Sequence, residues 1–143
     1  MRTQIYTADI LNLETVTVNE EDETEIRQPT IVPNVEGEPE FNIQTLQSLV
    51  EANTATIEPH SDARQIVLVT TDLLGCFASN GLENYFDPIE RVSDIQAGNF
   101  GAILGLQVIV NDKTEGPCVA VVDVLDQEEG VTIRTFSAAR VKP

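Results

Sequence analysis

The hydrophobic residues of this chain gather into short β-branched runs that turn-forming residues separate. The two densest runs are residues 106–110 and 118–122. The connector between them is polar and holds turn formers, namely Asn111, Asp112, Gly116 and Pro117. Runs of this length with such borders are typical of buried strands. The pattern therefore predicts a strand hairpin over residues 103–123.

A helical pattern precedes these runs. Apolar residues recur at positions i, i+3, i+6 and i+7 over residues 42–53, on Ile43, Leu46, Leu49 and Val50, which places them on one helix face. Asn42 is of a residue type that accepts backbone N–H groups at a helix start, so we expect it to be the N-cap. The continuous apolar run at 65–69 then predicts a strand that is buried on both faces.

The rest of the body is less regular. Residues 72–79 predict a second short helix, capped by Thr70 or Thr71 and ended by Asn80-Gly81, because glycine adopts the left-handed C′ conformation at little cost. Residues 82–102 combine aromatic residues with prolines and glycines and are expected to form a long loop that contacts a partner. A last strand is expected at 131–136.

The N-terminal third differs from the body. β-formers alternate imperfectly with polar residues on both sides of an acidic run that includes Glu21 and Asp22, which suits a two-stranded hairpin over residues 13–32 with a charged tip. Three prolines in residues 29–40 indicate an extended linker. We therefore expect an acidic arm at 1–40 and a globular body at 41–143. The fold class is α+β: a small mixed or antiparallel sheet, two short helices and an extended N-terminal β-hairpin arm.

The chain is strongly acidic. Its formal net charge is −16, from 24 acidic and 8 basic residues. Such a charge repels phosphate, so we expect no direct sequence-specific binding of nucleic acid. Two interpretations remain open: solubility in a salt-rich habitat, or work in a dense assembly with a negative face. No apolar run is long enough for a transmembrane helix, and the N-terminus lacks a signal-peptide layout, so no membrane association is expected.

Few residues suggest chemistry. Cys76 and Cys118 stand in apolar surroundings and are expected to be buried free thiols. His60 lies beside Ser61 and Asp62, but neighbours in sequence do not make a triad, whose groups converge from different elements. Two cysteines and one histidine far apart supply no zinc site, and no glycine-rich phosphate loop is present. We expect no enzyme activity, no cofactor and no metal.

Three segments, taken in order, resemble a known family. NIQTLQSLVEA, ARQIVLVTTDLLGCFAS and FGAILGLQVIVNDKTEGPCVAVVD are similar to a helix, a strand-then-helix segment and a hairpin in the C-terminal half of HK97-type major capsid proteins of tailed viruses. The resemblance covers about residues 42–136, with the arm matched by analogy. No segment of the chain is long enough for the family's spine helix, so the resemblance implies a reduced or partial version of such a capsid protein.

The resemblance implies a virion protein, assembled in the host cytoplasm, that binds copies of itself and other virion proteins in an icosahedral shell. The loop at 82–101 would then point to a ring centre. The candidate subunit contacts are two acidic residues of the arm tip, three aromatic residues and two arginines: Glu21, Asp22, Tyr85, Phe86, Phe100, Arg134 and Arg140.

Two other hypotheses remain open. The chain could be a decoration or accessory protein that binds an existing shell, or a small acidic enzyme or regulatory domain unrelated to viruses. The last would need a cleft near Asp72, Cys76 and Asp94.

Overall fold

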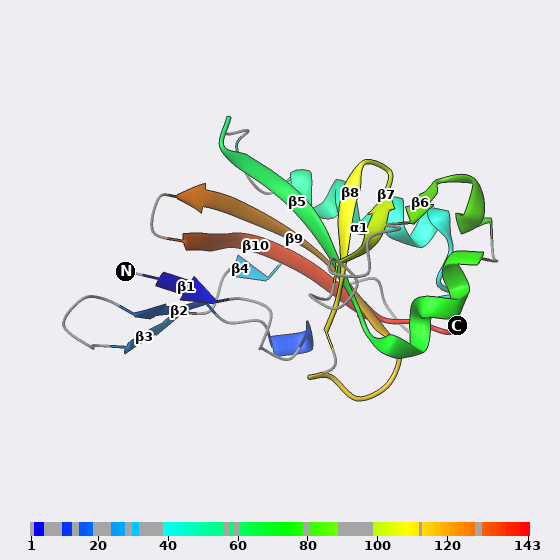
Figure 1. The fold of residues 1–143 in the computed structure, drawn as a ribbon, viewed down its shortest axis with the longest axis horizontal. Coiled ribbons are helices and arrows are strands. Elements are labelled where there is room, and N and C mark those ends of the chain that lie inside the picture. Colours follow the sequence, from blue (N-terminus) through cyan, green and yellow to red (C-terminus); the bar gives the residue numbers. More distant parts are fainter. Residues whose placement is uncertain are drawn as a thin grey trace.

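The computed structural model describes residues 2–4, 10–12, 15–18, 24–27, 30–31, 39–55, 58, 61–78, 81–88, 99–111, 113–127 and 130–143. The fold is α+β (Figure 1). A twisted mixed sheet forms the body, and a smaller three-stranded sheet projects from the end opposite the C-terminus. The predicted α+β class with a mixed sheet is therefore confirmed.

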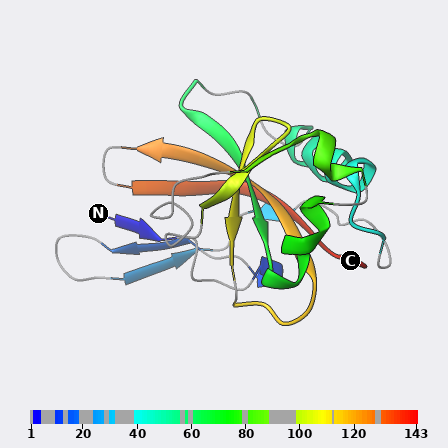
Figure 2. The ribbon, with the colours of Figure 1, turned by 45° about the vertical axis from the view of Figure 1, so that its right-hand side comes forward.

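The main sheet has seven strands. In spatial order these are β4 (Thr30–Ile31), β10 (Gly130–Arg140), β9 (Cys118–Gln127), β5 (Ala63–Val69), β8 (Leu106–Val110), β7 (Asn99–Ile103) and β6 (Phe86–Pro88). Neighbouring strands run antiparallel except β4 with β10 and β5 with β8, which are parallel. Figure 2 shows the strands fanning out, as expected from the right-handed twist of strands.

The expected hairpin over residues 103–123 is wrong. Its two runs are strands, β8 and β9, but β5 lies between them and pairs with both. The true hairpins are β7–β8, which turns at Leu104-Gly105, and β9–β10. Gly105 has φ +77, a value that favours glycine in a tight turn. β5 is buried on both faces as predicted, because its last four residues are fully covered.

Helices cover one face of this sheet. α1 (Ile43–Thr54) begins as predicted, since the Asn42 side chain accepts a hydrogen bond from the Thr45 N–H at 3.0 Å. Its Leu46 and Leu49 are buried against the sheet. The 3-10 helix η2 (Thr71–Ala78) adds Phe77, whose ring meets that of Phe41 edge-on at 5.6 Å. The predicted second helix is thus present, with the tighter 3-10 winding.

The opposite face of the sheet carries its own apolar cluster, to which β5, β8, β9 and β10 contribute. The short 3-10 helix η1 (Ile10–Asn12) inserts into it, because Ile10 is fully buried there. The Ile10 N–H donates to the Thr114 hydroxyl. Residues from the N-terminal third therefore form part of the body's core.

The smaller sheet consists of β1 (Arg2–Gln4), β2 (Thr15–Val18) and β3 (Thr24–Arg27). β2 and β3 form an antiparallel pair, as the alternating pattern predicts, and β1 adds a third strand that the pattern did not predict. The acidic residues Glu21 and Asp22, between β2 and β3, lie outside the described residues.

The expected long loop at 82–102 is wrong in part. It contains η3 (Leu82–Asn84), β6 and most of β7, while residues 89–98 lie outside the described part. Gly81 has φ +80, which confirms the predicted left-handed glycine. The last strand is longer than expected, since β10 continues to Arg140. Burial of Cys76 and Cys118 as free thiols is confirmed, whereas His60 lies outside the described residues.

Candidate functional site

Two aromatic residues proposed as subunit contacts differ in exposure. Tyr85 is 46% exposed. Among the described residues, no other large hydrophobic side chain is exposed. Phe86 next to it is half-buried, and its ring packs 4.7 Å from that of Phe77. Tyr85 is therefore free to meet a partner, whereas Phe86 joins the core. The Phe100 side chain lies outside the described residues.

Arg134 is engaged within its own chain. The β9–β10 ladder pairs Ile133 with Val124 and Thr135 with Asp123, so Arg134 is the extra residue of a β-bulge. A bulge redirects a side chain, and here the Arg134 Nε donates to the Asp123 Oδ1 at 2.6 Å. Its Nη1 also donates to the Glu58 carbonyl at 3.0 Å. The geometry assigns Arg134 an internal role, and its predicted subunit contact stays a prediction.

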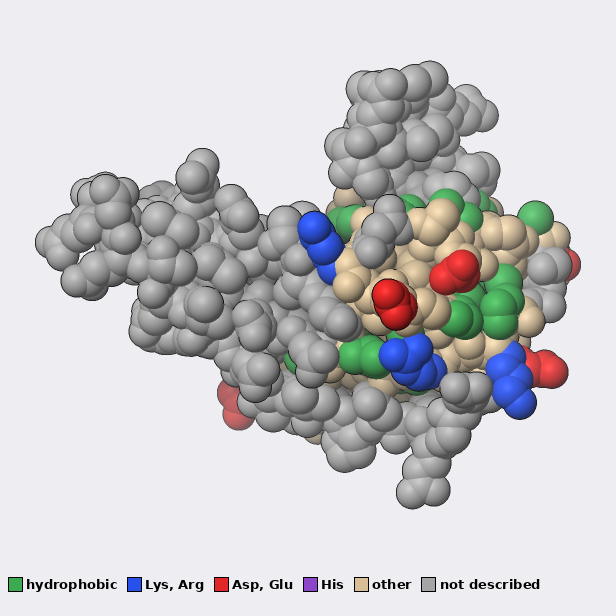
Figure 3. Space-filling model, turned by 90° about the horizontal axis from the view of Figure 1, so that it is seen from below, with side chains coloured by type: hydrophobic (Ala, Val, Ile, Leu, Met, Phe, Trp, Pro, Cys, Tyr) green, Lys and Arg blue, Asp and Glu red, His purple; other side chains and the backbone are tan. Residues whose placement is uncertain are grey.

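Arg140 lies at the exposed end of β10. Its Nη1 donates to the Glu115 carbonyl at 3.1 Å, and the Val141 N–H donates to the Pro117 carbonyl at 3.0 Å. These bonds tie the 113–117 loop to the end of β10. Exposed Lys113 and Lys142 stand on the same two segments. Figure 3 shows basic side chains spread over the lower face with acidic ones between them.

A surface cavity of about 290 Å³ lies between α1 and the β7–β8 turn. Its lining is Gln47, Val50, Glu51, Leu104 and Leu106. The volume is at the lower limit for small-molecule sites and suits a single inserted side chain better than a cofactor. Leu104 reaches this position with φ 52, which is uncommon for a residue other than glycine.

Tyr85 lies at the same end of the β6–β7 ladder as Leu104, which lines this cavity. Phe86 pairs with Ile103 in the antiparallel β6–β7 ladder, so Tyr85 and Leu104, one residue beyond that pair on each strand, are neighbours. The sequence pattern missed this arrangement because residues 82–102 read as loop. The one available signal was Leu104 directly before Gly105, an apolar residue at a turn position that usually holds a polar one.

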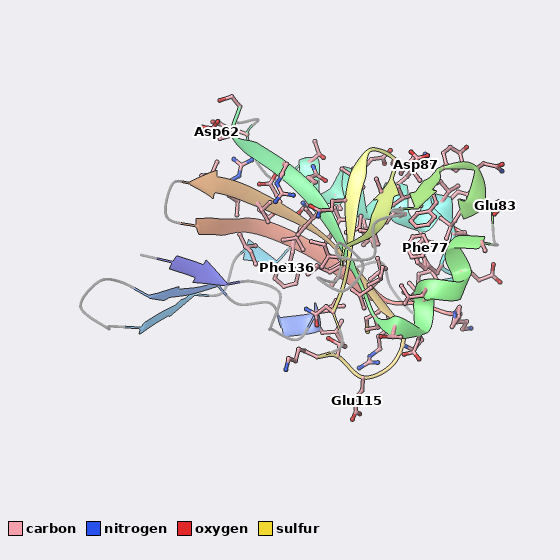
Figure 4. All side chains as sticks on the ribbon, in the orientation of Figure 1. Asp62, Phe77, Glu83, Asp87, Glu115 and Phe136 are labelled. Atoms are coloured by element: carbon pink, nitrogen blue, oxygen red, sulfur yellow. The ribbon has the colours of Figure 1, made fainter. Side chains whose placement is uncertain are left out.

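The surroundings of Tyr85 are acidic. Glu51, Glu83 and Asp87 are exposed, and none of their carboxylates forms an ion pair within the described residues. In Figure 4, Glu83 and Asp87 lie at one end of the molecule and Glu115 projects from a different side. The site thus joins an aromatic side chain, a shallow apolar cavity and unpaired negative charge.

A cluster of polar side chains lies between α1 and the sheet, away from the Tyr85 site. Gln65, Asp123 and Thr135 face one another across β5, β9 and β10. The Thr135 hydroxyl donates to the Asn53 Oδ1, and the Gln65 Nε2 donates to the Thr54 hydroxyl at 2.9 Å. The buried Asn53 Nδ2 and Gln65 Oε1 have no hydrogen-bond partner in the described part of the chain. This donor and this acceptor have the chemistry to hold ordered water.

No protein-family model, curated protein or solved structure matches this chain.

Other kinds of site have little support in the described residues. They contain no group of three or more histidine, cysteine or acidic side chains placed to hold a metal ion. None of their helices is long and apolar enough to cross a membrane. Cys76 sits on the η2 face that packs into the core, and burial raises the pKa of its thiol, which disfavours the nucleophilic thiolate.

Proposed function

We propose that this chain is a structural subunit that assembles with copies of itself into a closed shell, as HK97-type capsid subunits do. The order of elements supports the proposal in part: α1, the buried strand β5 and the short helix η2 follow the first two segments on which the resemblance rests. The third segment forms β7, β8 and β9, but β8 and β9 are not the hairpin that the resemblance implies, because β5 lies between them. The resemblance is a likeness of pattern and carries function only by analogy.

The main observation behind the proposal is that a strand from the N-terminal third, β4, pairs with β10 of the main sheet. β4 pairs with β10 through two residue pairs, Thr30 with Thr135 and Ile31 with Phe136. β10 has eleven residues, and besides β4 the described chain places beside this edge the parallel bridge of Glu40 with Lys142, just past the end of the strand. Among the described residues the other positions of this edge have no ladder partner. An open edge accepts an extended segment by backbone hydrogen bonding.

The contacts that β4 and Ile10 make with the body can also form between two copies of the chain. A segment that adds one short strand and one buried side chain, Ile10, makes the same contacts with a neighbour's body as with its own. Exchange of an identical element costs little because no new interface is needed. In the proposed shell, residues 1–31 lie across the neighbouring subunit and the main sheet is the rigid support.

A disulfide trap tests this arrangement. Thr30 and Thr135 are register partners, so the double variant Thr30→Cys/Thr135→Cys places two thiols on adjacent strands. After mild oxidation, the proposal predicts covalent ladders of several chains on a non-reducing gel. The single variant Thr135→Cys loses the same hydrogen bond to Asn53, so it is the matched control and gives no ladder. Circular dichroism first shows that both variants fold. Cross-linking confined to single chains, in a protein that forms no particles in electron microscopy, contradicts the proposal.

A further inference from the structure

We propose that the surface around Tyr85 binds the cationic end of a second copy of this chain. The Tyr85 surface comprises Tyr85, the cavity that Leu104 lines and the carboxylates of Glu51, Glu83 and Asp87. The cationic end comprises Lys113, Arg140 and Lys142, and the exposed acidic residues Glu115 and Glu40 lie on the adjoining backbone. The inference rests on the proposed self-assembly and names the two surfaces that meet in it.

The Tyr85 surface has the composition of a contact site. Tyrosine is enriched at the centre of interfaces, where its ring is buried and its hydroxyl finds a partner. Around it, Val50, Leu104 and Leu106 are only half-buried although they pack against the core. Leu104 holds its side chain at the cavity from a backbone conformation that glycine or asparagine adopts more easily. Uncommon backbone geometry of this kind often accompanies function.

The negative charge of the Tyr85 surface favours a positively charged partner. Two exposed carboxylates, those of Glu83 and Asp87, stand two residues before and after Tyr85, and Glu51 lines the cavity. Two copies meeting through this same surface would bring unpaired carboxylates together, which is costly. A positively charged partner is therefore favoured over a symmetric dimer of Tyr85 surfaces.

The chain itself supplies such a partner. Three of its eight basic residues stand on two segments that hydrogen bonds hold together, the 113–117 loop and the end of β10. Lys113 and Lys142 form no ion pair within the described residues. A lysine stem covers apolar surface while its ammonium reaches a carboxylate, which fits a cavity lined by leucines and rimmed by Glu51.

The two surfaces lie on different sides of one molecule. Figure 4 shows Glu83 and Asp87 at one end and Glu115, whose carbonyl binds Arg140, on another side. A contact between two different surfaces is heterologous, so each copy donates one surface and offers the other. Repetition of such a contact produces a ring when its rotation closes, which is the arrangement a shell subunit requires.

Charge exchange tests the pairing. At one fixed salt concentration, sedimentation velocity is measured for the wild type, Tyr85→Ala, Glu51→Lys, Lys142→Glu and the double variant Glu51→Lys/Lys142→Glu. We expect Tyr85→Ala to raise the dissociation constant of self-association roughly thirtyfold or more. Each single charge reversal is expected to raise it about fivefold, and the double variant to restore it, because the two charges are exchanged. Glu58→Lys, at an exposed site elsewhere, is the control.

The outcomes separate this inference from the proposed function. A wild type that stays monomeric overturns the self-assembly and the inference with it. A wild type that assembles while Tyr85→Ala and Glu51→Lys, folded by circular dichroism, assemble equally well overturns the inference alone. Failure of the double variant to recover what each reversal loses overturns the pairing of Glu51 with Lys142.

Discussion

The Arg134 Nε donates to the Asp123 Oδ1 at 2.6 Å, and a bulge in β10 leaves Arg134 without a ladder partner next to the Thr135–Asp123 pair. The Asp123 side chain is 5% exposed and that of Arg134 is 23% exposed. Asp123 interrupts the apolar run 118–125 of β9, and the bulge places a cation beside it. One extra residue in β10 thus compensates a charge buried in β9.

Removing Arg134 is expected to lower the free energy of unfolding more than removing Asp123. Arg134→Ala leaves the Asp123 carboxylate buried without its cation and should lower the free energy of unfolding by about 2–3 kcal/mol. Asp123→Ala should cost less, because Arg134 keeps the Glu58 carbonyl and reaches solvent. Urea denaturation measures both variants, with Lys113→Ala, at an exposed cation that forms no ion pair within the described residues, as the control. An equal or reversed order contradicts this assignment.

The Thr135–Asn53 hydrogen bond is expected to hold α1 on the sheet. Thr135→Val removes the donor and leaves both polar atoms of the buried Asn53 side chain without a partner in the described chain. We expect a loss of about 1–3 kcal/mol in the free energy of unfolding. Ser48→Ala, which removes an exposed hydroxyl from the same helix, should change it by less than about 0.5 kcal/mol. Equal effects of the two variants would count against the assignment.

Gly101 is expected to tolerate no side chain. A Cβ there would stand 2.5 Å from the Asp87 carbonyl oxygen and 2.9 Å from the Phe86 ring. Gly101→Ala should therefore lower the free energy of unfolding by about 2–3 kcal/mol. Gly75→Ala is the matched control, because a Cβ at Gly75 meets nothing within 4 Å, and it should be neutral or stabilise by up to about 1 kcal/mol. Thermal melts of both variants measure the change in stability, and an equal change in the two would contradict the prediction.

Ile10 is expected to stabilise the body although it lies far from it in sequence. Ile10→Ala removes a fully buried side chain from the second apolar cluster and should cost about 2–4 kcal/mol. Leu11→Ala, at a half-buried neighbour, should cost clearly less. Denaturant unfolding followed by circular dichroism gives both values, and an unaffected Ile10→Ala would show that the segment contributes nothing to the core.

Cys76 is expected to make stability fall at alkaline pH. Burial raises the pKa of its thiol, so the folded chain keeps a proton that the unfolded chain releases above about pH 8.5. The free energy of unfolding should therefore decrease as pH rises from there toward the folded pKa, and less steeply in Cys76→Ala. Unfolding curves over this pH range measure the slope. Identical slopes in the two proteins would contradict the expectation.

Local features of this fold were predictable from sequence and long-range pairing was not. The helical period and the Asn42 cap lie within a few residues of each other, so α1 was predicted to within one residue at each end. The runs that form β8 and β9 were correctly expected to be buried strands. Their pairing was wrong because β5, about forty residues earlier, inserts between them.

The candidate site was predictable only in part. Tyr85 was expected as a contact and is exposed, but its place next to Leu104 depends on the β6–β7 ladder, which Pro88 and Gly101 concealed as loop. Gly101 is needed in that ladder because the Phe86 ring and the Asp87 carbonyl pack against it. The internal role of Arg134 depends on a bulge, whose mark in the sequence is a break in the apolar alternation: Ile133 and Phe136 face the same apolar cluster although they are three residues apart.

Self-assembly is the central claim, and sedimentation velocity of the wild-type chain over a wide concentration range, with and without added KCl, tests it most directly. With a net charge of −16, salt should favour assembly by screening repulsion between copies. The account predicts discrete species far heavier than the 15.7 kDa chain, visible as closed particles in electron microscopy. A single species of one chain's mass at every concentration and salt level would contradict it.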